Sequence, residues 1–199
     1  MNLNDYRMVF AVASLTLVLL AVIPALVWVM PFQSSGERFS ELWVSGGSNH
    51  MMADYPFDVR VNGSYTIAVG VGNRMGVSSY YLVYVKFRNQ TQLLPNTTLS
   101  EPSPLPPLYE YQVFVAGGGN WESPLVFRIL AISQHEETLS LSRVSINDEV
   151  FATNASSAWD SEFKGYYLQL LLELWLYDVT TRSFQFDNRF VGIWMNITA

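Results

Sequence analysis

Cysteine is absent from this chain of 199 residues. Its absence excludes a disulfide framework, a thiol nucleophile and a thiolate metal site, so packing alone must hold the fold together. Histidine is nearly as scarce, since His50 and His135 are the only two, and their positions do not have the close spacing of a metal-binding pair. We therefore expect each histidine to be a loop or surface residue.

The sequence also lacks a serine nucleophile elbow, a phosphate-binding loop and a calcium loop. The segment His135–Glu137 places a possible base beside carboxylates, but adjacent strand residues point to opposite faces, so a turn is the simpler interpretation. Asp160 and Glu162 could serve glycoside hydrolysis only if a cleft held them about 5–10 Å apart. We expect a non-enzymatic protein without a cofactor or a resident metal.

Basic residues are few and scattered, with 11 Lys and Arg against 17 Asp and Glu and a net charge of -6. Nucleic-acid binding requires clustered basic side chains, so it is not expected here. Half of the residues are hydrophobic and 15% are aromatic, which is typical of a compact domain with a real core. The roughly 165 residues after the first 32 suit one domain.

One long apolar run stands out at residues 8–32, which contain no charge and only Ser14 and Thr16 as polar interruptions. As a helix this run is long enough to cross the roughly 30 Å hydrocarbon layer of a bilayer. A cleavable secretory signal has a shorter apolar core and a small-residue cleavage site, whereas this run ends at Pro31 and Phe32. The pattern predicts one retained transmembrane helix that contacts the lipid bilayer through residues 8–32.

The orientation of this helix follows from Asn-x-Ser/Thr glycosylation motifs, because the charges around it give only a weak positive-inside signal. All of these motifs come after the apolar run, at Asn62, Asn89, Asn96, Asn154 and Asn196. N-glycosylation takes place outside the cytoplasm, so we expect a cytoplasmic tail at residues 1–7 and an extracytoplasmic domain at residues 33–199. The sequence thus predicts a single-pass glycoprotein of the cell surface.

Alternation of apolar and polar residues predicts an all-β domain. Asn62-Gly63 separates two alternating runs at 57–61 and 65–71, which indicates a β-hairpin. Further strands are predicted at 39–44, 80–87, 109–115, 125–132 and 139–146, and in the strand at 80–87 the residues Tyr81, Val83, Val85 and Phe87 share one face.

Two connections and one ambiguous segment complete the pattern. The proline-rich stretch 88–108 is expected to be a long exposed connection that crosses between two sheets, and 117–120 a hairpin connection. Residues 163–178 fit both a helix and a strand; we favour a strand paired with 190–197 across a turn at 180–188, because leucines occupy one alternating face. The resulting eight to nine strands suit an immunoglobulin-like antiparallel β-sandwich.

Four segments carry a resemblance to a known family: FSELWV at 39–44, DYPFDVRV at 54–61, AVGVGNRMG at 68–76 and YYLVYVKFRN at 80–89. The chain resembles the soluble domain of an archaeal membrane-protein family called domain of unknown function 1616. The resemblance is densest over residues 39–91 and implies an archaeal envelope protein with an immunoglobulin-like or adhesion-type sandwich; it implies no catalytic residues. Several membrane helices usually precede the domain in that family, whereas this chain has one candidate helix.

Three functions remain open at this stage. The first is a membrane-tethered interaction or scaffolding domain, such as an accessory subunit of a larger membrane complex, that binds other membrane or surface proteins. Its candidate contact residues are Tyr80, Tyr84, Trp121 and Trp159, although core packing is an alternative role for each of them. The second is a pilin-like filament subunit, and the third is a carbohydrate-binding surface module, which a groove lined by tryptophan and carboxylates would favour.

Overall fold

The computed structural model describes residues 6–7, 9–18, 20, 37–47 and 55–198. The chain divides into two units, Met1–Gly36 and Glu37–Ala199, which we describe separately. In the first unit the described residues are helical, and the hydroxyls of Ser14 and Thr16 donate hydrogen bonds to backbone carbonyls one turn earlier, to Phe10 and Val12 at 2.8 Å. The large apolar side chains of this helix are exposed, as the 73% exposure of Phe10 illustrates.

Within the described residues, no helix combines the length and the apolar character needed to cross a membrane. Most of the second half of the predicted transmembrane segment, residues 21–32, lies outside the described residues. The transmembrane helix therefore stays a prediction.

The second unit is all-β, as the alternation predicted. Its strands are β1 (Ser40–Gly46), β2 (Asp58–Arg60), β3 (Tyr65–Asn73), β4 (Ser79–Arg88), β5 (Tyr109–Val115), β6 (Asn120–His135), β7 (Thr138–Ile146), β8 (Glu149–Ala152), β9 (Ser156–Asp160), β10 (Gly165–Asp178) and β11 (Ser183–Thr198). The prediction of eight to nine strands was too low because β8 and β9 are only 4 and 5 residues long. Such short strands do not show enough alternation to be recognised in the sequence.

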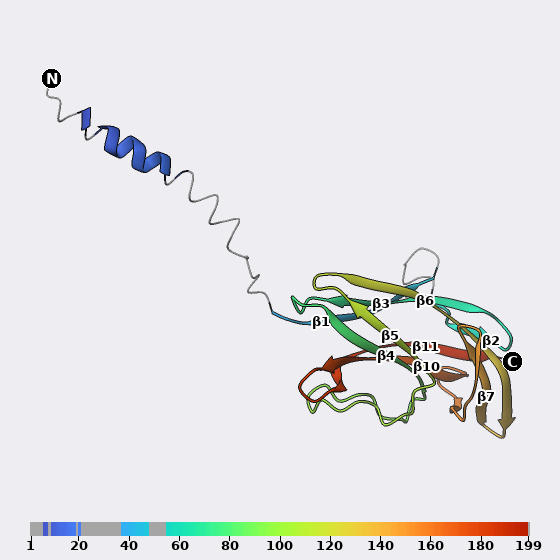
Figure 1. The fold of residues 1–199 in the computed structure, drawn as a ribbon. Helices are drawn as coiled ribbons and strands as arrows, with labels where there is room; N and C mark the ends of the chain where they lie inside the picture. The colour runs from blue at the N-terminus through green and yellow to red at the C-terminus, as the bar shows by residue number, and fades with distance from the viewer. Residues whose placement is uncertain (1–5, 8, 19, 21–36, 48–54, 199) are drawn as a thin grey trace. The chain divides into compact units, whose positions relative to one another are not determined.

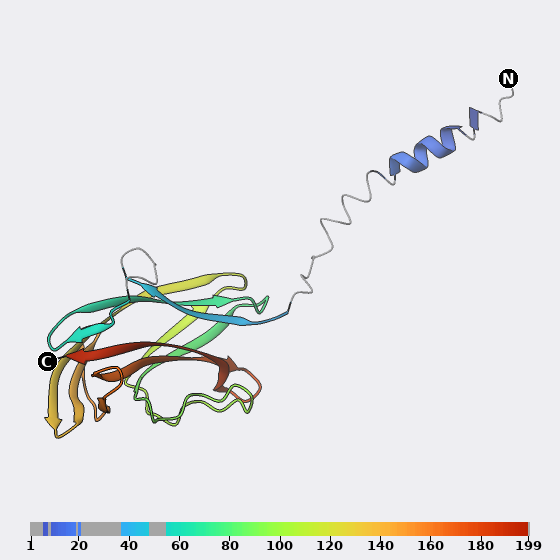
Figure 2. The ribbon, with the colours of Figure 1, turned by 180° about the vertical axis from the view of Figure 1, so that it is seen from behind.

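The strands form two facing layers (Figures 1 and 2). The first sheet has the order β1-β3-β6-β7, with β8 paired to β7, and the second has the order β2-β11-β10-β4-β5. Strand β9 pairs with β7 at one end and with β10 at the other, so it joins the two sheets along one side. Among the described strands, all pairings are antiparallel except that of β2 with β11.

The core lies between the sheets and is built by alternate residues of the long strands. The predicted face of β4 is confirmed, since Tyr81, Val83 and Val85 are fully buried and Phe87 is 5% exposed. In β10 the even-numbered leucines from Leu168 to Leu174 are fully buried against them. Burial of each such side chain contributes roughly 1.5–3 kcal/mol relative to its exposed state.

The strand assignment of 163–178 is confirmed by β10, and its partner is β11, as predicted. The turn between them is shorter than the predicted 180–188, because β11 already begins at Ser183. The odd-numbered face of β10 is buried as well, with Leu171 and Glu173 at 0% exposure. This second buried face explains why the leucine pattern also fitted a helix.

The predicted hairpin at 57–71 is wrong in its pairing, although its turn exists. Asn62 has a φ of 65°, and the Gly63 N–H donates to the Arg60 carbonyl at 3.0 Å. However, β2 pairs in parallel with β11 in the second sheet, and β3 pairs with β1 and β6 in the first. The turn thus carries the chain from one sheet to the other, because alternation specifies the buried face of a strand but not its neighbour.

The two predicted connections are also corrected. Residues 117–120 do not close a hairpin, because β5 belongs to the second sheet and β6 to the first. Conversely, the long connection after β4 does not cross between sheets, since β4 and β5 are neighbours in the second sheet. This connection, residues 89–108, runs beneath β4 and β10 in Figure 1 and buries its own Ser103 to 3% exposure, so it is not wholly exposed.

Candidate functional site

The connection 89–108 covers the centre of the outer face of the second sheet. Lys86 and Glu173 lie beneath this connection with side-chain exposures of 3% and 0%, and the Lys86 Nζ is 2.7 Å from the Glu173 Oε2. Nζ also donates to the Ser103 carbonyl at 2.9 Å, and the Ser103 N–H donates to the Glu173 Oε1 at 2.9 Å. The ion pair therefore fastens the connection to the sheet.

A second cation fastens the start of the same connection. The Arg88 Nε donates to the Gln92 carbonyl at 2.7 Å and Nη1 donates to the Gln169 Oε1 at 3.0 Å. Its guanidinium carbon lies 5.5 Å from the centre of the Trp194 ring, within the range of a cation–π contact. Burial lowers the pKa of Arg88 from its ordinary value, yet arginine stays charged at neutral pH.

An aromatic cleft of about 350 Å³ opens beside Arg88. It is lined by Phe57, Gln90, Phe163, Tyr167 and Trp194, which come from the segment before β2, the connection, the β9–β10 turn, β10 and β11. The Tyr167 ring lies 6.1 Å from the Phe57 ring and 6.3 Å from the Phe163 ring. Exposures of 53% for Phe57, 65% for Phe163 and 37% for Trp194 show that the cleft opens to solvent.

Polar groups at the rim of the aromatic cleft are held in place. The Gln90 Nε2 donates to the Asp160 Oδ2 at 2.9 Å, and the Tyr167 hydroxyl donates to the Phe163 carbonyl at 2.8 Å. The Asp160 Oδ1 accepts the N–H groups of Glu162 and Phe163 at 2.9 Å. The bond from Phe163 and then that from Gln90 lower the pKa of Asp160 from its ordinary value, so this carboxylate is ionised at neutral pH.

A separate aromatic surface lies at the other end of the same face, beside the β10–β11 turn. Its members are Tyr80, Phe114, Tyr177 and Phe184, which we call the turn-end surface. The Phe184 ring lies 5.2 Å from the rings of Tyr80 and Tyr177, and Phe114, directly opposite Tyr80, is 71% exposed. The connection 89–108 thus covers the centre of the outer face and leaves aromatic groups accessible at both ends of that face.

The four aromatic residues predicted as contacts have different positions. Tyr80 belongs to the turn-end surface, and the Tyr84 ring packs against the Trp175 ring at 5.4 Å. Trp121 instead packs against the core residue Tyr111 at 5.2 Å. Trp159 is 42% exposed and contacts Tyr166 away from both aromatic surfaces.

Sequence reasoning missed the aromatic cleft. Phe163 and Tyr167 are neighbours in the chain, but Phe57 and Trp194 come from segments far from them and from each other, so no local pattern joins the four. A larger hollow of about 400 Å³ contains Glu110 and Glu149, but its aromatic residues Tyr109 and Phe151 are partly buried against the core and pack on each other at 6.1 Å.

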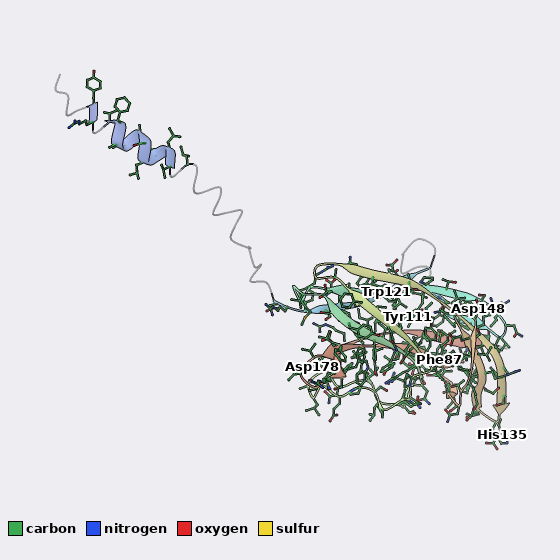
Figure 3. All side chains as sticks on the ribbon, viewed as in Figure 1. Phe87, Tyr111, Trp121, His135, Asp148 and Asp178 are labelled. Atoms are coloured by element: carbon green, nitrogen blue, oxygen red, sulfur yellow. The ribbon has the colours of Figure 1, made fainter. Side chains whose placement is uncertain are left out.

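Of the residues considered for catalysis, Asp160 and Glu162 lie at the end of β9 and in the β9–β10 turn beside the aromatic cleft, and the Asp160 Oδ1 accepts the Glu162 N–H at 2.9 Å. His135 lies exposed at the tip of the β6–β7 hairpin (Figure 3), and Glu136 has a φ of 52° in the predicted turn. His50 lies outside the described residues. The described residues contain no group of three or more His, Cys, Asp or Glu side chains placed to hold a metal ion. The absence of enzymatic activity remains a prediction.

The glycosylation motifs fall into two structural groups. Asn62, Asn96 and Asn154 are exposed, in turns or loops. The side-chain amide of Asn89 donates to the Ser156 carbonyl at 2.8 Å, and that of Asn196 donates to the Asp58 Oδ1 at 3.0 Å; both asparagines are partly buried.

No protein-family model and no curated protein sequence matches the chain. Among solved structures, a β-glucosidase from Listeria innocua in complex with glucose aligns with a TM-score of 0.40 and 7% identity over 81% of this chain and 16% of that chain. This chain therefore spans about a sixth of the glucosidase.

Two smaller structures align over similar shares of this chain. The CARDB domain of a Pyrococcus furiosus protein in complex with di-metal ions aligns with a TM-score of 0.36 and 11% identity, over 83% of this chain and 97% of that domain. A structure of the human complex between zinc 2-glycoprotein and prolactin inducible protein has a TM-score of 0.38 and 9% identity, over 83% of this chain and 100% of the matched chain. TM-scores at this level support no conclusion about function.

Proposed function

We propose that the chain is a non-enzymatic interaction domain, held at the outer side of a cell membrane by its N-terminal apolar segment. The observation that carries the proposal is the turn-end surface, where Phe114 is 71% exposed beside the packed rings of Tyr80, Tyr177 and Phe184. Aromatic side chains are enriched at the centres of protein interfaces, and burying one there yields a large share of the binding energy. The partner we propose is another protein subunit of the same membrane assembly.

The membrane tether rests on the N-terminal segment. The apolar side chains of the described helix are exposed, as lipid-facing side chains would be, and the uncharged run continues in the sequence to Phe32. Every glycosylation motif follows this run. These features favour the proposed cell-surface glycoprotein. The two facing sheets, together with the resemblance to the archaeal family, support an immunoglobulin-like assignment of the domain.

Extraction of the full chain from membranes in a mild detergent, followed by mass spectrometry, tests the proposal. We expect a membrane protein that co-purifies reproducibly with the wild type and is lost with Phe114→Ser. The matched control is Val150→Ser, because Val150 is 60% exposed on β8 in the other sheet. A chain recovered alone, or partners retained equally by both variants, would contradict the proposed interface, and recovery in the soluble fraction would contradict the tether.

A further inference from the structure

We infer that the aromatic cleft binds a neutral pyranose ring, as found in the sugar units of a surface glycan. This binding function is separate from the turn-end surface and does not depend on it. Its basis is the combination of open aromatic walls with a few fixed polar groups in a cleft of about 350 Å³. Ligand pockets in proteins span roughly 300–1,000 Å³, so the aromatic cleft is large enough for a small ligand.

The walls of the cleft provide stacking surfaces. Trp194 projects from the outer face of β11 and retains 37% exposure, although Arg88 lies over its ring. Arg88 does not line the cleft, so the remaining indole surface is available to a ligand. The C–H groups on the faces of a sugar ring form an apolar surface that packs on aromatic rings. The negative face of the aromatic ring favours contact with the slightly positive hydrogens of these C–H groups.

The polar groups at the rim match hydroxyl donors. The Gln90 amide is oriented by its bond to Asp160, and among the described residues its Oε1 accepts no hydrogen bond. The Tyr167 hydroxyl uses its proton on the Phe163 carbonyl, so towards the cleft its oxygen can act only as an acceptor. The ligand must therefore supply hydrogen-bond donors, and a polyhydroxylated ring carries such O–H groups around its circumference.

Charge and exposure argue against other ligand classes. Arg88 lies over the Trp194 ring and would repel a quaternary ammonium group that stacked on that ring. The ionised Asp160 behind Gln90 would repel an anion. Phe57 and Phe163 are more than half exposed, so an acyl chain would remain largely in contact with water. A neutral polar ring satisfies all three conditions.

The test uses the full chain, produced in a host without N-glycosylation so that no attached sugar occupies the cleft, in a detergent that has no sugar headgroup. Saturation-transfer NMR and titration calorimetry would measure binding of cellotriose, maltotriose and triacetylchitotriose, with choline as the charged comparison. We expect at least one trisaccharide to bind, with saturation concentrated on the ring C–H protons, and choline not to bind.

Four variants locate the binding. Trp194→Ala should weaken the affinity about tenfold, which equals ~1.4 kcal/mol, and Trp194→Phe should retain most of it because the ring persists. Gln90→Leu should weaken it severalfold through the lost acceptor. Trp159→Ala is the matched control, since Trp159 is similarly exposed but outside the cleft, and it should bind as the wild type does. Binding of choline alone, no binding of any trisaccharide, or equal loss with Trp159→Ala would overturn the inference.

Discussion

The ion pair of Lys86 and Glu173 gives the sharpest test of how the connection 89–108 is held. In Glu173→Gln the shape is kept and Oε1 can still accept the Ser103 N–H, but the buried ammonium loses its counter-charge. Removing one partner of a buried ion pair costs about 3–5 kcal/mol. Natural domains are stable by only about 5–15 kcal/mol, so this loss is a large fraction of the total.

Urea unfolding of the full chain, followed by tryptophan fluorescence, measures this loss. With an m-value of about 2 kcal/mol/M, the expected cost lowers the unfolding midpoint by about 1.5–2.5 M. The control is Glu41→Gln, because Glu41 forms a 2.9 Å pair with Arg74 while both side chains are about one-third exposed. Exposed pairs contribute about 0–1 kcal/mol, so this variant should differ little from the wild type.

A double variant separates charge from packing. Lys86→Met with Glu173→Leu removes both charges, and replacing a buried pair by apolar groups is often neutral or stabilising. The Ser103 N–H then loses its acceptor, which costs about 1–3 kcal/mol, so the double variant should be more stable than Glu173→Gln alone. The reasoning is refuted if Glu173→Gln costs no more than Glu41→Gln.

Three further outcomes are expected. Burial raises the pKa of Tyr111 to about 12 against the opposing hydrogen bond from Asn147. The contribution of Tyr111 to folding stability should therefore be full below pH about 10 and be lost towards pH 12. Tyr111→Phe should flatten this fall in the urea midpoint. Burial raises the pKa of Asp187, whose Oδ2 has no hydrogen-bond partner, so the folded state binds the carboxyl proton more tightly than the unfolded state does. Asp187→Asn should therefore raise the urea midpoint at pH 7. This gain should shrink as the pH falls towards about 3.9. Glycopeptide mass spectrometry of protein from a glycosylating host should find sugars at the exposed motifs Asn62, Asn96 and Asn154, and occupancy concentrated at the partly buried motifs would contradict this accessibility argument.

The sequence predicted which faces of the strands are buried. Alternation placed Tyr81, Val83 and Val85 on one face and found the bounds of β5, because a half-buried strand must alternate to bury its apolar side chains. It could not predict the partners of β2 and β3, since strand pairing depends on segments far apart in the chain. Hence the turn at Asn62 was expected, but the passage between sheets was not.

The sequence could not predict the aromatic cleft or the buried ion pair of Lys86 and Glu173, because both depend on contacts between segments far apart in the chain. Glu173 fits the outward face of β10 in the alternating pattern, and it does point outward, yet the connection 89–108 buries it completely. A proline-rich segment gives no signal of the surface it covers. Trp194 and Phe57 meet only because β11 pairs with β2, the one parallel pairing of the described strands.

The pairing of β2 with β11 also determines when the domain can be completed during biosynthesis. Asp58 and its hydrogen-bond partner Asn196 are 138 residues apart in the chain, and the ribosome makes β2 long before β11 exists. Until then β2 lacks its partner, and β4 lacks its partner on one edge until β10 is made; long-range pairings of this kind form slowly. The nascent chain thus presents unpaired strand edges to its surroundings for most of its synthesis, a period in which chaperone protection would matter most.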